Sequence, residues 1–329
     1  MKFHIFILLI AVLLSVGAEA RLYSNYYARS CPNVESIVRD AVVNKQLSAQ
    51  TTAAGTLRLF FHDCFVGGCD ASVLVSSSRF LRAERDADIN LSLPGDAFDA
   101  VVRAKTNLEL ACPATVSCAD VLALATRDLL TMLGGPFYRV RLGRRDSLSS
   151  SVASVADNLP LPNMSVPQLI KHFQDKGFRV REMVALTGAH TVGFSHCKEF
   201  ASRIYNYNNG GPTSFDPSMN PRLAQGLQSA CRNHDKDPTI SAFNDIMTPS
   251  KFDNMYFKNL ERGLGLLASD QALMADPRTA ALVREYAANE TAFFNDFVLA
   301  MQKLSEYGVK TGSQGEVRRR CDVFNNFSL

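Results

Sequence analysis

The sequence predicts a mainly α-helical fold with little β structure, and two observations carry this prediction. Apolar residues recur at the three- and four-residue spacing of a helix face in several long segments. Runs that alternate apolar and polar side chains, as half-buried strands do, are few and short. The 329-residue chain has 47% hydrophobic and 20% charged residues, which is the balance of a folded globular protein rather than a disordered one.

Two helices in the first half of the chain have recognisable start signals. Asn33 is a candidate N-cap for a helix whose apolar face lies within 34–42. Ser117 and Asp120 resemble a capping box, with Asp in place of the preferred Glu. The apolar helix that they open is predicted to continue until Gly134-Gly135-Pro136 stops it.

Three more helices are predicted in the second half. Ser165 opens one that Gly177 ends, and Asp276-Pro277 opens the next. A stripe of apolar side chains from Phe293 to Leu304 forms the last, which Gly308 closes. We also expect helical structure around the histidines discussed below.

Two segments are predicted to be irregular. Residues 139–163 and 205–245 are rich in Ser, Asn, Gly and Pro. Neither has a composition that separates domains, and the chain contains no internal repeat. Loops of this length in a compact protein usually carry function.

The first twenty residues predict the compartment. Residues 1–20 have a basic start, an almost wholly apolar stretch at 3–16, and small residues at both ends of Ala18-Glu19-Ala20. We interpret them as a secretory signal peptide that is cleaved before Arg21. The alternative, a membrane anchor, is disfavoured because the stretch is shorter than the ~20 residues of a span.

The charge balance argues against a nucleic-acid partner. The formal net charge is +3, from 35 basic and 32 acidic residues, and the longest basic run is Arg318-Arg319-Arg320. A weak positive charge is compatible with retention on acidic cell-wall polysaccharide. We expect no membrane anchor in the mature chain and a monomer.

Eight cysteines lie after residue 20. In a secreted protein they are expected to be oxidised, and eight allow 105 pairings, so spacing alone leaves the connectivity open. A structural zinc site is disfavoured because no Cys-x-x-Cys pair occurs. Four glycosylation sequons also fit a secreted protein; they begin at Asn90, Asn163, Asn289 and Asn326.

The segment from Leu57 to Phe65 is the most informative for chemistry. Arg58 and His62 are four residues apart, so on a helix they share one face. A permanent cation beside a histidine that can accept a proton is a candidate acid–base pair. By itself, such a pair is also compatible with an ordinary amphipathic helix.

A second histidine, His190, is flanked by small residues that would let a bulky group approach its ring. Neutral imidazole is the commonest metal ligand, although a lone histidine at a helix end is more often structural. Asp270 is an acid among apolar neighbours and requires a partner.

Oxygen ligands cluster in two sets that suit Ca²⁺. One set is Asp63, Asp70 and Ser72, and the other is Thr191, Asp245, Thr248 and Asp253. Neither has the spacing of an EF-hand, and each set taken alone is equally compatible with turn and cap residues.

Five ordered segments resemble the class III secretory plant peroxidases, the family of horseradish peroxidase. The first reads Arg58-Leu-Phe-Phe-His62-Asp-Cys-Phe-Val-Gly-Gly-Cys69-Asp-Ala-Ser72, and the others are 111–120, 142–146, 184–193 and 252–256. The resemblance covers the mature chain over about 22–322, and it predicts a haem peroxidase domain at 21–329. It implies the plant haem-peroxidase fold, in which two helical lobes, about 21–160 and 161–329, sandwich a haem.

Carried over residue by residue, the resemblance implies a haem b enzyme that reduces H₂O₂ to water and oxidises phenolic donors in one-electron steps. His190 is then the axial iron ligand, and Asp270 accepts a hydrogen bond from its other ring nitrogen. On the opposite haem face, His62 takes a proton from H₂O₂ and returns it to the leaving oxygen. Arg58 stabilises the charge that develops on the O–O bond.

Further residues receive roles by the same resemblance. Phe61 keeps large substrates away from the iron, and Pro160 offers a carbonyl near which aromatic donors dock. Asn90 orients His62, so we expect its sequon to carry no glycan.

The resemblance also implies two calcium ions. The distal site uses Asp63, Asp70, Ser72 and the carbonyls of Val66 and Gly68, with Glu84 acting through water. The proximal site uses Thr191, Asp245, Thr248, Asp253 and the carbonyl of Lys251. The implied disulfides are Cys31–Cys112, Cys64–Cys69, Cys118–Cys321 and Cys197–Cys231.

The chain departs from the family at a few positions. Tyr138 stands where a Trp is common. At the edge where aromatic donors are expected to dock, which we call the donor edge, some relatives have Phe where this chain has Leu161, Asn163 and Glu199. Only eight residues follow Cys321, which favours the cell wall over the vacuole. The expected roles are cell-wall lignification and cross-linking, peroxide removal and the response to oxidative stress.

Two other classes of function compete with the peroxidase interpretation. One is a secreted, calcium-bound protein that binds cell-wall polysaccharide and whose peroxidase activity is secondary. The other is a cysteine or serine hydrolase, which is disfavoured if all eight cysteines are paired.

Overall fold

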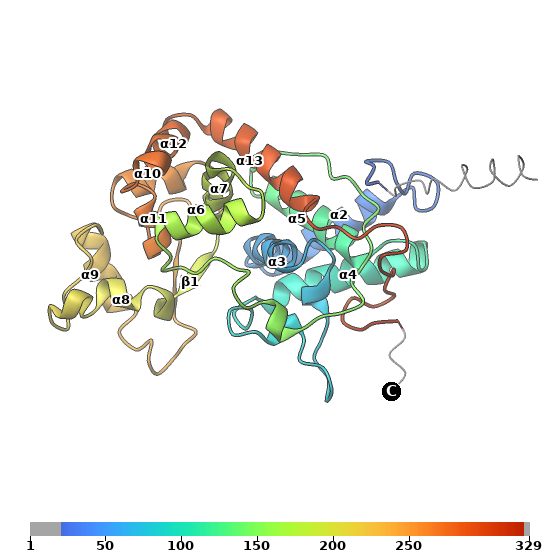
Figure 1. Cartoon of the computed structure of the whole chain (residues 1–329), viewed down its shortest axis with the longest axis horizontal. Coiled ribbons are helices and arrows are strands. Elements are labelled where there is room, and N and C mark those ends of the chain that lie inside the picture. The colour runs from blue at the N-terminus through green and yellow to red at the C-terminus, as the bar shows by residue number, and fades with distance from the viewer. Residues whose placement is uncertain (1–20, 326–329) are drawn as a thin grey trace, which may run out of the picture.

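The computed structural model describes residues 21–325, and this part of the chain is mainly helical (Figure 1). Its two-stranded sheet is short: β1 (Phe194–His196) pairs antiparallel with β2 (Ser241–Phe243). The predicted fold class is therefore confirmed. The signal peptide predicted at 1–20 and the sequon at Asn326 lie outside the described residues.

Four helices from the first half of the chain pack against one another. Helix α3 lies at the centre of Figure 1, beside its neighbours. The helices are α2 (Val34–Ser48), α3 (Thr52–Val66), α4 (Gly95–Ala111) and α5 (Cys118–Met132). Helix α4 was not predicted, because Pro94 and Gly95 at its start provide no side-chain cap.

A second group of helices comes from the second half. Helix α7 packs against α12 and α13, and α10 packs against α12. The group consists of α6 (Val166–Asp175), α7 (Val180–Thr187), α10 (Met255–Glu261), α11 (Ala268–Ala272), α12 (Pro277–Ala288) and α13 (Glu290–Ser305). Because α13 also contacts α3, one continuous apolar core joins the two groups.

A smaller apolar core lies under α8 (Ala201–Ile204) and α9 (Pro221–Ala230). Helix α9 corrects the prediction that all of 205–245 is irregular. Its start has a complete signal, since Asn220 Oδ1 accepts the backbone N–H of Arg222 at 3.0 Å and Pro221 occupies the first turn. The Asn- and Gly-rich composition around the helix concealed this signal.

The other predicted helix ends are mostly confirmed. Ser117 Oγ accepts the N–H of Asp120 at 3.2 Å, and Asp276 Oδ1 accepts that of Arg278 at 2.9 Å. Gly177, at φ +82°, follows the end of α6. The expected cap at Asn33 is wrong: the residue precedes α2, but its side chain makes no capping hydrogen bond.

After α13 the chain returns to the first group of helices. The backbone N–H of Arg145 donates to the Lys310 carbonyl at 2.8 Å, and that of Ser76 donates to the Asp322 carbonyl at 2.8 Å. We call residues 306–322 the returning segment. It covers the loop that follows α3, where the backbones of Gly68 and Gly308 touch.

The four implied disulfides are the pairs found in the structure, and they join Cys31 to Cys112, Cys64 to Cys69, Cys118 to Cys321 and Cys197 to Cys231. No cysteine is free, so a cysteine nucleophile is excluded. The Cys118–Cys321 bridge fastens the end of the returning segment to the start of α5.

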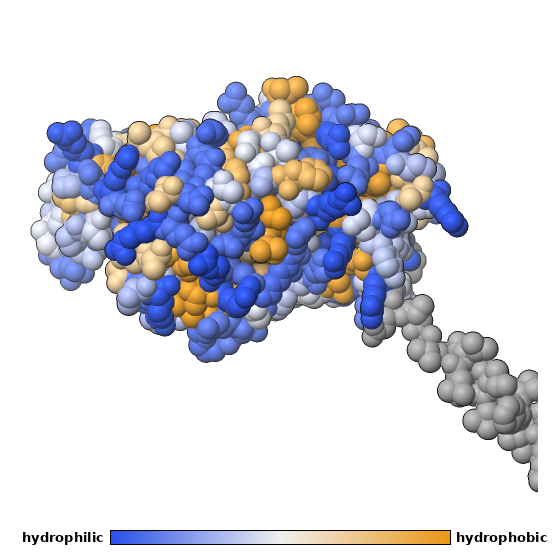
Figure 2. Space-filling model, turned by 90° about the horizontal axis from the view of Figure 1, so that it is seen from above, coloured by the Kyte–Doolittle hydropathy of each residue, from blue (hydrophilic) through white to orange (hydrophobic). Residues whose placement is uncertain are grey.

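The face seen in Figure 2 is mostly hydrophilic, with apolar side chains scattered in separate patches. Within residues 21–325, no helix combines the length and the apolar character that a membrane crossing requires.

Gly68 provides a test of the contact between the returning segment and the α3 loop. Its φ is +116°, and an added Cβ would overlap the carbonyl of Gly308. We expect Gly68→Ala to lower the free energy of unfolding by about 2–4 kcal/mol, from backbone strain and overlap together. Urea unfolding of the calcium-replete protein measures this loss.

Gly67→Ala is the matched control, because Gly67 has φ −127° and an added Cβ there meets no atom within 4 Å. We expect a change within about 0.5 kcal/mol. Equal effects of the two substitutions would contradict the close contact.

Candidate active site

Helix α3 places the predicted acid–base pair on one face. Arg58 Nε lies 3.2 Å from His62 Nε2. Arg58 is held in place because its guanidinium donates to the carbonyls of Ile89 and Ser92, both at 3.1 Å, and to Ser92 Oγ at 2.9 Å. Sequence analysis missed Ile89 and Ser92, since backbone acceptors leave no sequence signal.

The second ring nitrogen of His62 faces Asn90. His62 Nδ1 lies 2.6 Å from Asn90 Oδ1, and Asn90 Nδ2 donates to the carbonyl of Glu84 at 2.8 Å. Because the amide oxygen of Asn90 can only accept, it fixes the proton of His62 on Nδ1 and leaves Nε2 as an acceptor. Burial, and then the charge of Arg58, lower the pKa of His62 to about 3. His62 is therefore a neutral base at physiological pH.

Beside this pair, buried carboxylates converge on the loop after α3. Asp63 Oδ2 accepts the N–H of Ala71 at 2.9 Å, and Ser72 Oγ donates to Glu84 Oε2 at 3.0 Å. Burial and the charge of Asp70 raise the pKa of Asp63 well above its usual range. Burial likewise raises the pKa of Glu84 to about 7. Like charges in a buried loop favour a bound cation.

Lys310, from the returning segment, forms an ion pair with Asp70 Oδ2. This contact was not predicted, because it joins residues that are 240 positions apart. The other carboxylate oxygen, Asp70 Oδ1, accepts the N–H of Ser72 at 3.0 Å.

The second histidine lies in the short 3₁₀ turn after α7, Gly188–Thr191. His190 Nδ1 is 2.9 Å from Asp270 Oδ1, which is on α11. Burial acts to lower the pKa of His190, but the charge and the hydrogen bond of Asp270 outweigh it, so the pKa is raised. The side chain of His190 is 39% exposed while that of Asp270 is buried. Within residues 21–325, Nε2 of His190 has no hydrogen-bond partner.

Next to His190, hydroxyl and carboxylate oxygens gather. Thr191 Oγ1 lies 3.3 Å from both Asp245 Oδ2 and Asp253 Oδ1. Thr248 Oγ1 lies 3.0 Å and 3.2 Å from the same two atoms. Lys251 forms an ion pair with Asp253 at 3.3 Å. The structure thus brings together four of the five residues predicted for the proximal calcium.

Across residues 21–325, no three His, Cys, Asp or Glu side chains are arranged as a metal-binding group. Each predicted calcium set instead combines two buried carboxylates with Ser or Thr hydroxyls nearby. That oxygen-only donor set is the one that Ca²⁺ prefers. The residues present therefore fit calcium better than a softer metal.

Arg58 lies near both histidines, although they are 128 positions apart in sequence. The positive charge of Arg58 reaches His190 and acts to lower its pKa. Phe61 stacks on Phe65 at 4.5 Å between ring centroids, which gives this space an apolar wall. A His190 Nε2 with no hydrogen-bond partner among the described residues, near a neutral base and a fixed cation, fits the ligand that an iron porphyrin requires.

The predicted donor edge is less tightly defined. Pro160 is half-buried, and the carbonyl of the neighbouring Pro162 accepts the N–H of Ser269, at the start of α11, at 2.9 Å. Leu161 and Asn163 are exposed, and the negative charge of Glu199 reaches Arg58. The edge is therefore more polar than a phenylalanine-lined one.

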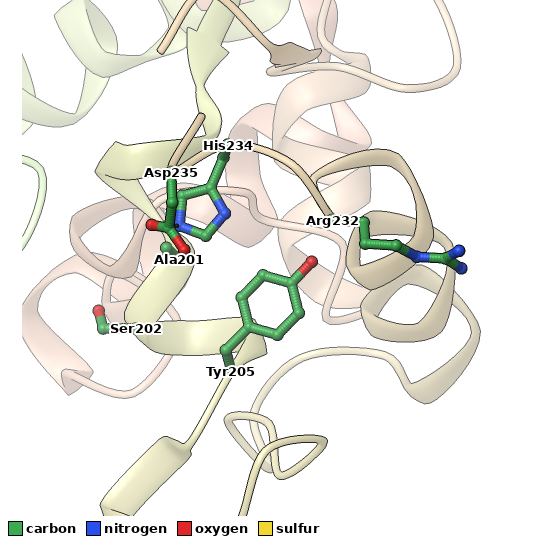
Figure 3. A pocket seen from close by; sticks show the side chains of 6 residues that line it. All are labelled: Ala201, Ser202, Tyr205, Arg232, His234 and Asp235. Atoms are coloured by element: carbon green, nitrogen blue, oxygen red, sulfur yellow. Dashed lines mark ion pairs between the residues drawn. The ribbon is translucent and has the colours of Figure 1, made fainter. Parts of the chain in front are cut away.

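A hollow of about 420 Å³ lies apart from these residues, beside α8 (Figure 3). The rings of Tyr205 and His234 stack there at 5.5 Å, while Arg232 points away from them. His234 Nδ1 bonds the carbonyl of Cys231 at 2.9 Å, and Tyr205 donates to that of Gln228 at 2.6 Å. The hollow contains none of the predicted site residues.

A neutral histidine, a second histidine paired with a carboxylate, a fixed arginine and two oxygen-rich clusters on a helical fold are what a haem-dependent peroxidase requires. The sequence model of the peroxidase family matches residues 34–289, so the chain belongs to the peroxidase family, in its class III plant branch. The protein is a haem peroxidase, an oxidoreductase that uses H₂O₂ and a donor substrate.

Several relatives from Arabidopsis thaliana are similar over nearly their whole length. Peroxidase 63 is 59% identical over 312 residues, which cover 95% of this chain and 93% of the relative. Peroxidase 31 is 58% identical over 308 residues, or 94% and 95% of the two chains. Peroxidase 65 is 58% identical over 310 residues, or 94% and 91%.

Asn90 provides a test of the geometry around His62. Its side chain is 2% exposed, and both of its amide atoms are hydrogen-bonded. A glycan on Nδ2 would displace the bond to Glu84, so we expect the folded, secreted protein to have no glycan at Asn90. Peptide mass spectrometry after enzymatic deglycosylation in H₂¹⁸O measures occupancy. Asn163, whose side chain is exposed, is the internal comparison, and an occupied Asn90 would contradict the geometry.

Proposed function

We propose that this peroxidase is secreted and oxidises phenolic donors in one-electron steps, with His190 as axial ligand and His62 as acid–base group. The observation that carries the proposal is the pair of histidines near Arg58: a neutral, buried His62 that is fixed by Asn90, and a His190 whose Nε2 is free and whose Nδ1 faces Asp270. Haem b, when bound, supplies the iron at which peroxide is reduced and to which donors deliver electrons.

The residues on the distal side move one proton. His62 Nε2 accepts a proton from the near oxygen of H₂O₂ and delivers it to the far oxygen, which leaves as water. Arg58 is always charged and is held by two carbonyls, so it stabilises the negative charge that develops on the departing oxygen without reorganising. Phe61 and Phe65 limit the space above the iron to a small molecule.

Asp270 orients the other histidine of the site, His190. Its carboxylate accepts a hydrogen bond from the N–H of His190 Nδ1, which fixes the tautomer and makes Nε2 a stronger ligand. This role explains why a carboxylate is buried among apolar residues, where it would otherwise be costly.

Two calcium ions belong to the proposal. Asp63 directly follows His62, and Thr191 directly follows His190. Each ion would bind the residue next to a histidine of the site, so it would hold the backbone that carries that histidine.

The proposed setting is the cell wall, with roles in lignification and cross-linking, peroxide removal and the response to oxidative stress. Phenolic donors would dock near Pro160, at an edge made polar by Asn163 and Glu199. The net charge of +3 is the only observation that favours retention on acidic polysaccharide.

Substitutions of His62 and His190 test the roles that are proposed for them. We expect His62→Ala to keep the Soret band of bound haem but to react with H₂O₂ about 10²–10⁴-fold more slowly, because the proton acceptor is lost. His190→Ala is expected to lose most of the bound haem. Stopped-flow absorbance and guaiacol oxidation measure both effects.

His234→Ala is the matched control, since His234 lies in the hollow beside α8 (Figure 3), and we expect the parent rate. A His62→Ala protein that oxidises guaiacol at the parent rate would refute the acid–base assignment. Parent protein that binds no haem would refute the proposal as a whole.

Calcium removal tests the cation sites. We expect chelation to lower both the thermal midpoint and the rate with H₂O₂, because Asp63 and Asp245 would be left buried without a counterion and Asp70 and Asp253 would each have one lysine. Returned Ca²⁺ should restore both quantities, and Mg²⁺ should not. Unchanged stability after calcium loss verified by elemental analysis would contradict the sites.

A further inference from the structure

A buried tyrosine shares the carboxylate oxygen that faces His190. The hydroxyl of Tyr256 donates to Asp270 Oδ1 at 2.9 Å, and His190 Nδ1 lies 2.9 Å from the same atom. Tyr256 and Asp270 are each 2% exposed. Nothing in the sequence analysis gave Tyr256 a role beyond its place in a family motif.

The position of this hydroxyl is fixed by packing. Tyr256 belongs to α10, which contacts the 3₁₀ turn that carries His190. Its ring meets that of His190 edge-on, with 6.1 Å between centroids. Burial and the charge of Asp270 also hold the pKa of Tyr256 well above its usual range, so the hydroxyl keeps its proton and remains a donor.

Two donors on one oxygen compete for the same negative charge. A carboxylate that is already neutralised in part by one hydrogen bond polarises a second donor less strongly. The bond from Tyr256 should therefore leave His190 less anionic than Asp270 alone would make it. Ligand basicity is one of the factors that set the potential of a haem iron.

We propose that Tyr256 is a positioning residue that acts through Asp270 to limit the anionic character of His190. The inference rests on the proposed role of His190 as axial ligand. The expected consequence, which does not depend on the substrate, is a higher ferric/ferrous midpoint potential of the haem iron than the His190–Asp270 pair alone would give.

The test compares Tyr256→Phe with the parent holoenzyme. Because Asp270 would then accept only from His190, the ligand should become more anionic and stabilise ferric iron. We expect the ferric/ferrous equilibrium to shift toward ferric iron by about threefold to tenfold, where tenfold corresponds to about 59 mV for one electron. The Fe–His stretching band of the reduced protein, seen by resonance Raman spectroscopy, should move to higher frequency.

Tyr286→Phe is the matched control. Tyr286 is also buried, its hydroxyl donates to the carboxylate of Asp296 at 2.7 Å, and its ring packs on Phe257 as that of Tyr256 does. It should lose comparable stability with no change in potential or Raman band.

The direction of the shift separates tuning from a merely structural role. Asp270→Asn weakens the acceptor and should raise the potential. If Tyr256 only holds Asp270 in place, Tyr256→Phe should shift the potential in that same direction, which would overturn the inference, as would no shift at all. If the Fe–His band persists in His190→Ala, the axial assignment itself fails, and the inference fails with it.

Discussion

Buried carboxylates beside both histidines are the constraint on which the site depends. Asp63 follows His62 on α3, and Asp270 faces His190 from α11. A carboxylate removed from water requires a cation or several donors, so each one dictates what must lie around it. Asp270 obtains two hydrogen-bond donors, and the loop of Asp63 obtains backbone N–H groups and the ammonium of Lys310 on Asp70. Asp270 thereby orients His190 directly, whereas Asp63 fixes the end of α3 next to His62.

The distal side is a continuous chain of hydrogen bonds rather than an isolated pair. His62 faces Asn90, Asn90 donates to the carbonyl of Glu84, and the carboxylate of Glu84 accepts from Ser72 in the predicted calcium loop. A change in that loop can reach the base through three contacts, with no displacement of the helix. In the proposed enzyme, these contacts would couple the distal calcium site to the proton-transfer site.

The sequence predicted well what is local and poorly what is distant. The four-residue spacing predicted that Arg58 and His62 share one face of a helix, and the cap residues predicted where α5 and α12 begin. Helix α4 was missed because its first residues carry no cap, and α9 because Asn and Gly surround it. Roles for Asn90 and Asp270 came only from the family resemblance. The contacts of Lys310 with Asp70 and of Tyr256 with Asp270 join separate elements, so no periodicity or motif could reveal them.

The returning segment has a consequence for how the protein is made. Proteins emerge from the ribosome N-terminus first, and their parts fold in that order where they can. Here the loop after α3, which carries Asp70, is closed by residues 306–322, which are synthesised long after it. The first group of helices can therefore collapse early, but the loop after α3 cannot be closed until residues 306–322 have been synthesised. The disulfide between Cys118 and Cys321, which are 203 positions apart, can then form once the returning segment has docked.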